Sequence, residues 1–341
     1  MSFPTSSIFL ALAAVGTASA AAVDHPQRNE AKNVTNFIAF GDSYTDACSS
    51  SRLQSFTPEQ RAKWPFPYCP PAPWGRASGG ESWPEYIRIL QGQAVPTDKD
   101  SPVQAAYKGE WTIQNLAQSA ATCDNAVFPR APINDVGQQI DLLKTNYNTT
   151  QPLDKIQTDP ATTWAAIFIG TNDISFYNST ADVAKETDCL ERRIQTLHDF
   201  GHRKFLILEN INLEYVPTYS TNGVVNKTIQ SYTSGNRKSQ AQLAEKLNKK
   251  WQSDGTEVLT FPTFELFSRM YNNPREYGME YVKVPCVTGT GNNTVTCSHP
   301  TKYLWWNDLH PSFHAEQILA AKVVKFLEEG ARGEDLLAGP Q

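Results

Sequence analysis

The sequence predicts an α/β fold, a three-layer α/β/α sandwich with a mainly parallel central sheet. Strand-like runs alternate with helical patterns along the chain, which favours a parallel sheet covered by helices on both faces. The first apolar run ends at Gly41-Asp42 and is followed at once by Ser43, so a serine is presented at the carboxyl end of a strand. Open α/β sheets place their active sites at this edge.

Hydrophobic periodicity predicts where the elements lie. Short apolar runs predict strands at 36–40, 164–169, 204–209 and 257–261. Apolar positions at helical spacing predict helices at 82–91, 135–146, 181–200, 233–251 and 312–329. No repeat or clean domain boundary interrupts this series, so one domain from residue 21 to residue 341 is the simplest organisation.

The composition is that of a folded, mildly acidic protein. Of the 341 residues, 40% are hydrophobic and 19% are charged, which supports a substantial core and argues against global disorder. A nucleic-acid partner would favour a basic patch, and the net charge of −5 gives no sign of one. We expect a monomer.

The first twenty residues predict a secretory signal peptide. The apolar run Ile8 to Val15 is followed by Ala18-Ser19-Ala20, which has the Ala-x-Ala form of a cleavage site. The run is too short to span a bilayer, and no later stretch is apolar enough to do so. The alternative is a buried N-terminal helix. We expect a secreted, extracellular protein with no membrane span.

Cysteines and glycosylation sequons fit this compartment. No Cys-x-x-Cys pair is present, which argues against a zinc site. An oxidising compartment favours disulfides, although connectivity cannot be deduced from sequence alone. The pairings that we favour are Cys286–Cys297, Cys48–Cys123 and Cys69–Cys189. The sequons predict exposed asparagines, where N-glycans are expected, at Asn33, Asn148, Asn178, Asn226 and Asn292.

Four short blocks follow one another in an order that suits ester chemistry. They are Gly41-Asp-Ser43, Asn115-Leu-Ala-Gln-Ser-Ala-Ala121, Gly170-Thr-Asn-Asp173 and Asn307-Asp-Leu-His-Pro-Ser312. Together they resemble the four blocks of the GDSL, or SGNH, hydrolase superfamily, over nearly the whole mature chain. The resemblance implies a flavodoxin-like fold and an esterase.

Five longer segments allow a finer comparison within that superfamily. They are Phe40-Gly-Asp-Ser-Tyr-Thr-Asp46, Gly75-Arg-Ala-Ser-Gly-Gly-Glu-Ser-Trp83, Asn115-Leu-Ala, Ala121-Thr-Cys-Asp-Asn125 and Trp305-Trp-Asn-Asp-Leu-His-Pro311. By these segments the chain resembles most the fungal secreted acetylesterases of carbohydrate esterase family sixteen. This resemblance implies deacetylation of acetylated sugars released from hemicellulose. We expect no cofactor.

Ester hydrolysis assigns roles to Ser43 and His310. A serine hydroxyl is a weak nucleophile until a histidine accepts its proton, and the same histidine later protonates the leaving alcohol. His310 lies in a loop just before the last predicted helix, which suits this task. His299, near a loop cysteine, stays an alternative. The remaining histidines are in the N-terminal tail or in helical patterns: His25, His198, His202 and His314.

The tetrahedral intermediate needs hydrogen-bond donors for its oxyanion. The resemblance implies that these donors are the Ser43 backbone N–H, the Ala120 backbone N–H and the Asn172 side chain. Taken alone, Asn172 would be a turn residue that satisfies its own backbone. The family usually carries glycine where this chain has Ala120, and alanine can serve if its φ is negative. Asp42, Asp173 and Asn115 are expected to brace the loops.

The catalytic acid is the open question. The superfamily usually places it three residues before the histidine, but that position is Asn307 here, and the aspartate comes one step later at Asp308. Three readings follow: a shifted loop lets Asp308 reach His310, Asn307 orients the ring instead, or hydrolysis is lost. We favour an active enzyme with Asp308 as the acid and Asn307 as the alternative.

The substrate is less constrained by the residues themselves. Tryptophans near the blocks suit stacking on sugar rings, although core packing is their commoner use; they are Trp64, Trp74, Trp83, Trp305 and Trp306. We expect an acetylated carbohydrate or another small ester. The alternatives are a GDSL lipase or phospholipase and a non-catalytic glycan-binding relative. No cluster of His and Asp ligands suggests a metal.

Overall fold

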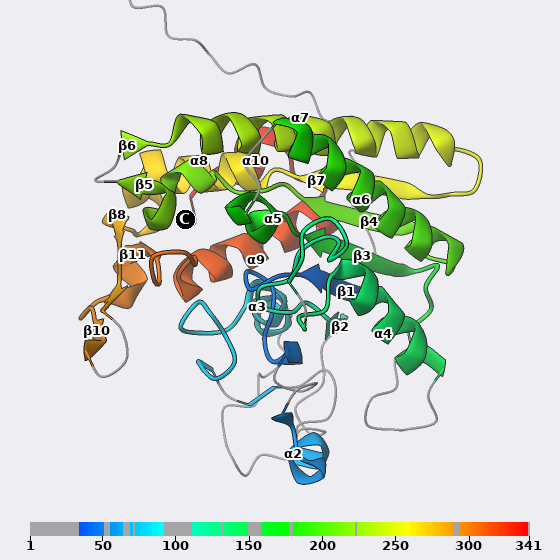
Figure 1. Ribbon diagram of the computed structural model, residues 1–341, viewed down its shortest axis with the longest axis horizontal. Helices are drawn as coiled ribbons and strands as arrows, with labels where there is room; N and C mark the ends of the chain where they lie inside the picture. Colours follow the sequence, from blue (N-terminus) through cyan, green and yellow to red (C-terminus); the bar gives the residue numbers. More distant parts are fainter. Residues whose placement is uncertain are drawn as a thin grey trace, which may run out of the picture.

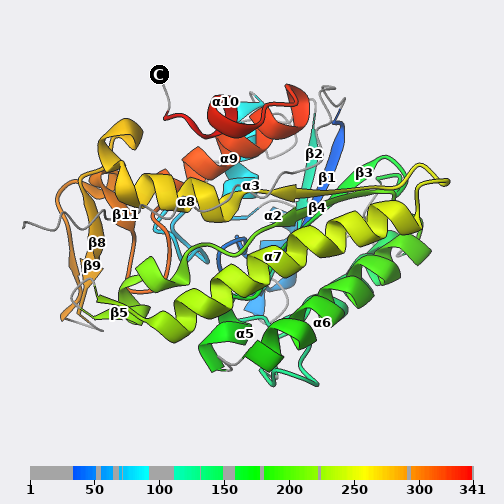
Figure 2. The ribbon, with the colours of Figure 1, turned by 90° about the horizontal axis from the view of Figure 1, so that it is seen from above.

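The computed structural model describes residues 34–50, 55–63, 69–70, 72–91, 111–130, 132–148, 158–176, 180–221, 224–289 and 293–339 (Figure 1). A five-stranded sheet lies at the centre of this part of the chain, and helices cover both of its faces (Figure 2). The predicted α/β class with a parallel sheet is confirmed.

The strands of the sheet are all parallel and are not in sequence order. From edge to edge they are β2 (Thr112–Asn115), β1 (Asn36–Gly41), β3 (Thr163–Phe168), β4 (Lys204–Leu208) and β7 (Glu257–Phe261). This is the flavodoxin-like order, in which the chain turns to opposite sides of β1 and β3. A switch point of this kind opens a crevice at the carboxyl ends of the two strands, where ligands bind.

Alternating strand residues form two cores, one under each helical layer. Phe37 and Ala39 face the same layer as Trp83, whereas Ile38 and Phe40 face the layer that contains Ile140. The first layer contains α3 (Trp83–Leu90), α8 (Thr263–Asn272), α9 (Phe313–Glu328) and α10 (Gly333–Leu337); the second contains α4 (Val136–Asn148), α6 (Thr180–Asp199) and α7 (Lys227–Lys250).

All four predicted strands and all five predicted helices are present; β7 has the predicted bounds, and the other elements have shifted ends. The largest shift is at α7, because the Asn226 side chain accepts hydrogen bonds from the backbone N–H groups of Thr228 and Ile229 and so begins the helix earlier than its apolar positions indicate. In the sheet and the layers that cover it, the prediction missed β2, α8, α10 and the short helix α5 (Thr171–Phe176).

The remaining elements are small and lie outside the sheet. Three short strand pairs are β5 (Ser220–Thr221) with β6 (Val224–Val225), β8 (Tyr281–Pro285) with β11 (Tyr303–Trp305), and β9 (Val287–Thr288) with β10 (Val295–Thr296). A separate short helix, α2, spans Pro58–Lys63. Ser312 begins α9 by accepting a hydrogen bond from the Ala315 N–H at 3.3 Å, which fixes where the fourth sequence block ends.

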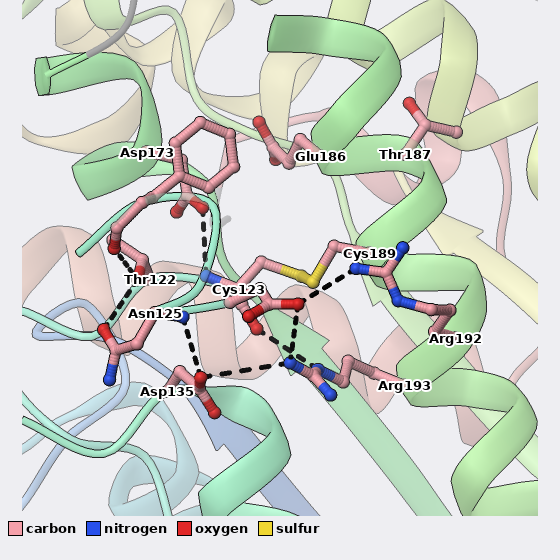
Figure 3. Close-up of a disulfide and its surroundings, with 12 residues drawn as sticks. Thr122, Cys123, Asn125, Asp135, Asp173, Glu186, Thr187, Cys189, Arg192 and Arg193 are labelled. Atoms are coloured by element: carbon pink, nitrogen blue, oxygen red, sulfur yellow. Dashed lines mark hydrogen bonds and ion pairs between the residues drawn. A yellow bond between two sulfur atoms is a disulfide. The ribbon is translucent and has the colours of Figure 1, made fainter. Parts of the chain in front are cut away.

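Three disulfides are present, and two of them differ from the favoured pairing. Cys48 packs with Phe56 in a small cluster that also contains its partner. The loop that carries Cys123 lies instead against α6, where its own partner is found (Figure 3). The sequence offered no signal for these loop positions. The disulfides are Cys48–Cys69, Cys123–Cys189 and Cys286–Cys297, and only the last was predicted correctly.

The predicted signal peptide at residues 1–20 lies outside the described residues. Among the residues that are described, no helix is both long and apolar enough to cross a membrane. Asn226 is exposed, as its sequon predicts. The side chains of the other sequon asparagines, at 33, 148, 178 and 292, lie outside the described part.

Candidate active site

The site is built at the switch point, where β1 and β3 end side by side. Gly41 ends β1 with φ +151°, and a Cβ at this position would lie 2.1 Å from the Phe168 carbonyl oxygen on β3. Only glycine allows this approach. The chain then turns through Asp42, whose carbonyl accepts hydrogen bonds from the N–H groups of Thr45 (3.0 Å) and Asp46 (2.9 Å). This turn leaves Ser43 half-buried at the edge of the sheet.

Ser43 and His310 meet although 267 residues separate them. The Ser43 Oγ lies 2.8 Å from the His310 Nε2, which is hydrogen-bond distance for a nucleophile and its base. His310 is held in the loop between β11 and α9. The Tyr44 ring packs against the imidazole at 5.8 Å between centroids, and the Tyr44 hydroxyl donates to the Leu309 carbonyl at 2.8 Å.

Asn307 sets the tautomer of the histidine. Its Oδ1 accepts hydrogen bonds from the backbone N–H groups of Leu309 (3.0 Å) and His310 (2.8 Å), and it lies 2.9 Å from the His310 Nδ1. Because backbone N–H groups can only donate, the amide oxygen must face them and therefore also the ring. Nδ1 then carries the proton, and Nε2 presents its lone pair to Ser43.

The position of Asp308 corrects the preference for this residue as the acid. Its side chain is exposed, while its backbone carbonyl accepts hydrogen bonds from the Thr218 N–H (2.8 Å) and the Thr218 hydroxyl (2.7 Å). These bonds fix the loop so that Asn307 lies beside the imidazole. The loop therefore does not shift to bring Asp308 to His310, and Asn307 occupies the place of the acid.

The imidazole is neutral over a wide pH range. Burial lowers the pKa of His310 from its ordinary value of 6.5 to about 4, because desolvation disfavours the imidazolium. An aspartate at position 307 would oppose this effect, whereas the neutral amide of Asn307 does not. His310 is thus able to accept a proton even in mildly acidic solution.

Two backbone N–H groups, one on the first block and one on the second, have no protein partner in the described part of the chain. Within the described residues, neither the Ser43 N–H nor the Ala120 N–H has a hydrogen-bond acceptor. The Asn172 side chain lies with them: its Nδ2 donates to the Ala121 carbonyl at 2.8 Å and lies 3.4 Å from the Asp42 carboxylate. The second hydrogen bond is long and is therefore the weaker of the two. All three predicted oxyanion donors therefore lie around the end of the sheet.

Ala120 departs from the expectation of a negative φ. Its φ is +68°, the one positive value at a described residue other than glycine. The Ala121 N–H donates to the Gln118 carbonyl at 3.0 Å, which closes a turn with Ala120 at its third position. A turn that needs positive φ there favours glycine, the residue that the family usually has. The alanine is consequently strained by about 1–2 kcal/mol.

This strain makes a stability prediction. Replacing Ala120 with glycine is expected to raise the free energy of unfolding by about 1 kcal/mol. This net value is the strain that glycine removes from the folded state, minus the stabilisation of the unfolded chain by the extra conformational entropy of glycine. Urea unfolding with the disulfides intact measures the change. Ala126 is exposed and has no positive φ, so Ala126→Gly should instead destabilise the protein by about 0.5 kcal/mol. A loss of stability in both variants would contradict the strain at Ala120.

Buried carboxyl groups hold the surrounding loops, in agreement with their expected bracing role. Asp42 accepts from the Tyr44 N–H at 3.0 Å, and Asp173 accepts from the Cys123 N–H at 3.0 Å (Figure 3). Burial raises the pKa of Asp42 to about 7 and holds that of Asp173 well above its usual range; the nearby Glu186 carboxyl adds to both shifts. Both groups are therefore placed to hold the loops through hydrogen bonds.

The sequence did not point to Gln139, which lies fully buried on α4. Its side chain accepts from the Gly41 N–H at 3.0 Å and donates to the Gly41 carbonyl at 2.9 Å, so it clamps the peptide just before Asp42 and Ser43. A glutamine on a helix has no local pattern that marks such a role. Asn115 likewise ties the second block to the first, through a 2.5 Å bond from its Nδ2 to the Thr45 carbonyl.

The tryptophans divide between core and surface. Trp83 and Trp305 are fully buried, which excludes them from stacking on a sugar. Trp74 is 42% exposed and packs at a tilt on Phe56, and Trp306 is half-buried. Trp64 lies outside the described residues.

The rival histidines of the described residues have other partners, and His25 lies outside these residues. His299 is exposed and its Nδ1 lies 2.8 Å from the hydroxyl of the neighbouring Ser298. His198 contacts Asp254, His202 is buried on the Thr163 carbonyl, and His314 contacts the Tyr277 carbonyl. His310 is the histidine that the fold brings to Ser43.

A doubly wound parallel sheet with a serine, a histidine and an asparagine at its switch point has the geometry that serine hydrolases use. The sequence matches the family described as GDSL-like Lipase/Acylhydrolase over residues 37–323, and the chain belongs to this family. It is a carboxylic ester hydrolase by that membership and by its relatives.

The relatives include esterases from fungi and plants. An acetylesterase of Hypocrea jecorina is 27% identical over 81% of this chain and 83% of its own length. A GDSL esterase/lipase of Arabidopsis thaliana is 24% identical over 85% of this chain and 90% of its own. Among solved structures, the acetyl xylan esterase AlAXEase matches at 14% identity over 84% of this chain and 97% of its own, with a TM-score of 0.41.

Proposed function

We propose that the protein is a secreted serine esterase that removes acetyl groups from hemicellulose-derived oligosaccharides. The observation that carries the proposal is the 2.8 Å contact between Ser43 Oγ and His310 Nε2, with Asn307 on the other ring nitrogen. The acetylesterase of Hypocrea jecorina supports the choice of an acetyl ester.

In the proposed mechanism, Ser43 Oγ attacks the ester carbonyl while His310 Nε2 takes the hydroxyl proton. The carbonyl oxygen becomes an oxyanion that accepts from the Ser43 N–H, the Ala120 N–H and the Asn172 amide. Collapse breaks the bond to the sugar oxygen, which receives the proton from His310. Water then repeats the sequence on the acetyl-serine, releases acetate and restores Ser43.

The proposal extends to the form of the mature protein. Residues 1–20 would be removed as a signal peptide, and residues 21–341 would form a single monomeric domain with N-glycans at exposed sequons such as Asn226. Three buried or loop disulfides are compatible with an oxidising compartment.

The experiment is acetate release from acetylated xylo-oligosaccharides, measured beside the hydrolysis of aryl acetate and long-chain aryl esters. We expect acetate release from the oligosaccharides and a higher kcat/KM for the acetyl ester. A preference for long-chain esters would favour the second candidate, a lipase or phospholipase. The Arabidopsis thaliana relative is named as an esterase/lipase, which supports a lipase as the alternative. A protein that binds the sugar, hydrolyses no ester and shows no labelling of Ser43 by an organophosphonate would be a non-catalytic glycan-binding relative.

A further inference from the structure

Asp46 is a buried carboxylate that joins the nucleophile loop to the second sequence block. It is 2% exposed and lies three residues after Ser43. One of its oxygens accepts from the Ser49 N–H at 2.9 Å. The other accepts from the Ser50 hydroxyl (2.6 Å), the Ser119 N–H (2.8 Å) and the Ser119 hydroxyl (2.9 Å). Every partner is thus a donor.

Ser119 is the residue just before the strained Ala120. Asp46 bonds to the Ser119 N–H, which lies on the preceding peptide, and to the Ser119 hydroxyl, so it fixes the residue from which the peptide bearing the Ala120 N–H extends. The turn from Gln118 to Ala121 keeps Ala120 at φ +68°, a conformation that alanine disfavours. Asp46 accepts hydrogen bonds from both the N–H and the hydroxyl of Ser119. These bonds oppose a change of the turn towards a conformation in which Ala120 has a negative φ.

We propose that Asp46 is a positioning residue that holds Ser119 in its turn so that the N–H of the next residue, Ala120, faces the oxyanion. This inference rests on the proposed function, because it assigns Asp46 a part in stabilising the intermediate formed on Ser43. Asp46 touches neither the substrate nor the reacting atoms. It acts through the geometry of Ala120, and a chain with glycine at position 120 would need it less.

Asparagine cannot replace Asp46 without loss. Its oxygen can meet the Ser119 N–H or the Ser49 N–H, but its NH₂ then faces the other one, and two N–H donors cannot bond to each other. The two loops remain joined by a second set of bonds that does not include Asp46, from Asn115 Nδ2 to the Thr45 carbonyl (2.5 Å) and from the Ser49 hydroxyl to the Asn115 carbonyl (2.7 Å). We therefore expect the Asp46→Asn variant to fold.

The test is a double-mutant cycle with Asp46→Asn and Ala120→Gly, followed by kcat and KM for aryl acetate. We expect Asp46→Asn to lower kcat about 30-fold in the Ala120 background, with KM within about twofold, because one oxyanion donor is worth 10²–10³ in kcat and is here misdirected rather than removed. In the Ala120→Gly background the loss should be at most about threefold, since glycine adopts φ +68° without strain.

A matched control separates positioning from general loss of structure. Asp124 also accepts from a backbone N–H, that of Ala126 just after the second block, at 2.9 Å, and pairs with Arg192 at 3.0 Å, but it does not contact Ser119. Asp124→Asn should leave kcat unchanged. Thermal unfolding of every variant confirms that assays are made on folded protein.

The outcomes are distinct. An equal loss of kcat for Asp46→Asn in both backgrounds, or a change in thermal stability without a change in kcat, would overturn the inference alone. A wild-type protein that hydrolyses no ester would overturn the proposed function and this inference together.

Should Asp46→Asn not fold, Ser50→Ala replaces it in the cycle, because it removes only the 2.6 Å bond to Asp46 and a 3.0 Å contact with the Ser119 N–H. Its loss of kcat, about threefold, should again vanish with glycine at 120.

Discussion

Replacing Ser43 with alanine should lower kcat for acetyl ester hydrolysis by about 10⁶, the loss seen when a serine protease loses its nucleophile. No other described hydroxyl lies on His310 Nε2, so the variant retains only binding and the donors around the oxyanion. KM should change little, because the Ser43 hydroxyl contributes to bond making rather than to binding of the ester.

Acetate release from acetylated xylo-oligosaccharides by wild type and Ser43→Ala measures this effect. A second serine–histidine pair provides the control: Ser298 lies 2.8 Å from His299, but both are exposed and no third side chain orients the ring within the described residues. Ser298→Ala and His299→Ala should keep full activity and full labelling by an organophosphonate. A Ser43→Ala variant with more than about 1% of wild-type kcat would contradict Ser43 as the nucleophile.

Replacing Asn307 with aspartate should raise kcat about tenfold near neutral pH. A carboxylate at this position would accept the same three hydrogen bonds, from the N–H groups of Leu309 and His310 and from the imidazole. Hydrogen bonds to a charged group exceed neutral ones by about 1–2 kcal/mol, and the gain falls on the imidazolium that forms in the transition state. The expected gain in kcat is smaller than the factor of about 10⁴ by which kcat falls when asparagine replaces the catalytic aspartate of a serine protease. The reason is that Asn307 already imposes the useful tautomer on His310.

The pH profile gives the sharper readout. His310 must be neutral to accept a proton, so kcat/KM of the wild type should hold as pH falls and drop only near pH 4, where burial has placed the pKa. A carboxylate at 307 favours the imidazolium and raises this pKa towards the ordinary value of 6.5. The Asn307→Asp variant should therefore be faster than wild type at pH 8. As the pH is lowered, it should lose activity at a higher pH than the wild type does.

Two further variants complete this experiment. Asn307→Ala removes the acceptor for Nδ1 and should lower kcat by about 10²-fold, within the range that general-base catalysis contributes. Asp308→Ala changes an exposed side chain, so kcat and the pH at which kcat/KM falls in acid should both be the same as in wild type. Loss of turnover in Asp308→Ala, or an acid limb that stays near pH 4 in Asn307→Asp, would contradict the arrangement around His310.

Much of the fold could be predicted because its signals are local. An apolar run of strand length or a helical spacing of apolar residues is complete within a short segment, and the four predicted strands and five predicted helices are all present. Two of the missed elements are too short to show a period, because β2 has four residues and α5 has six. The missed helix α8 has ten residues and is long enough to show one.

The sequence by itself determined the class of fold and the order of the blocks, and it pointed to Ser43 and His310 as candidates, because each of these signals lies in adjacent residues. The tertiary structure alone decided three things: Asn307 rather than Asp308 faces the imidazole, Ala120 has a positive φ, and Cys48 and Cys123 have partners other than the favoured ones. The physical reason is common to all three. They depend on how irregular loops from distant parts of the chain are fixed against one another by hydrogen bonds and packing, such as Thr218 on the Asp308 carbonyl, and no local period records these contacts.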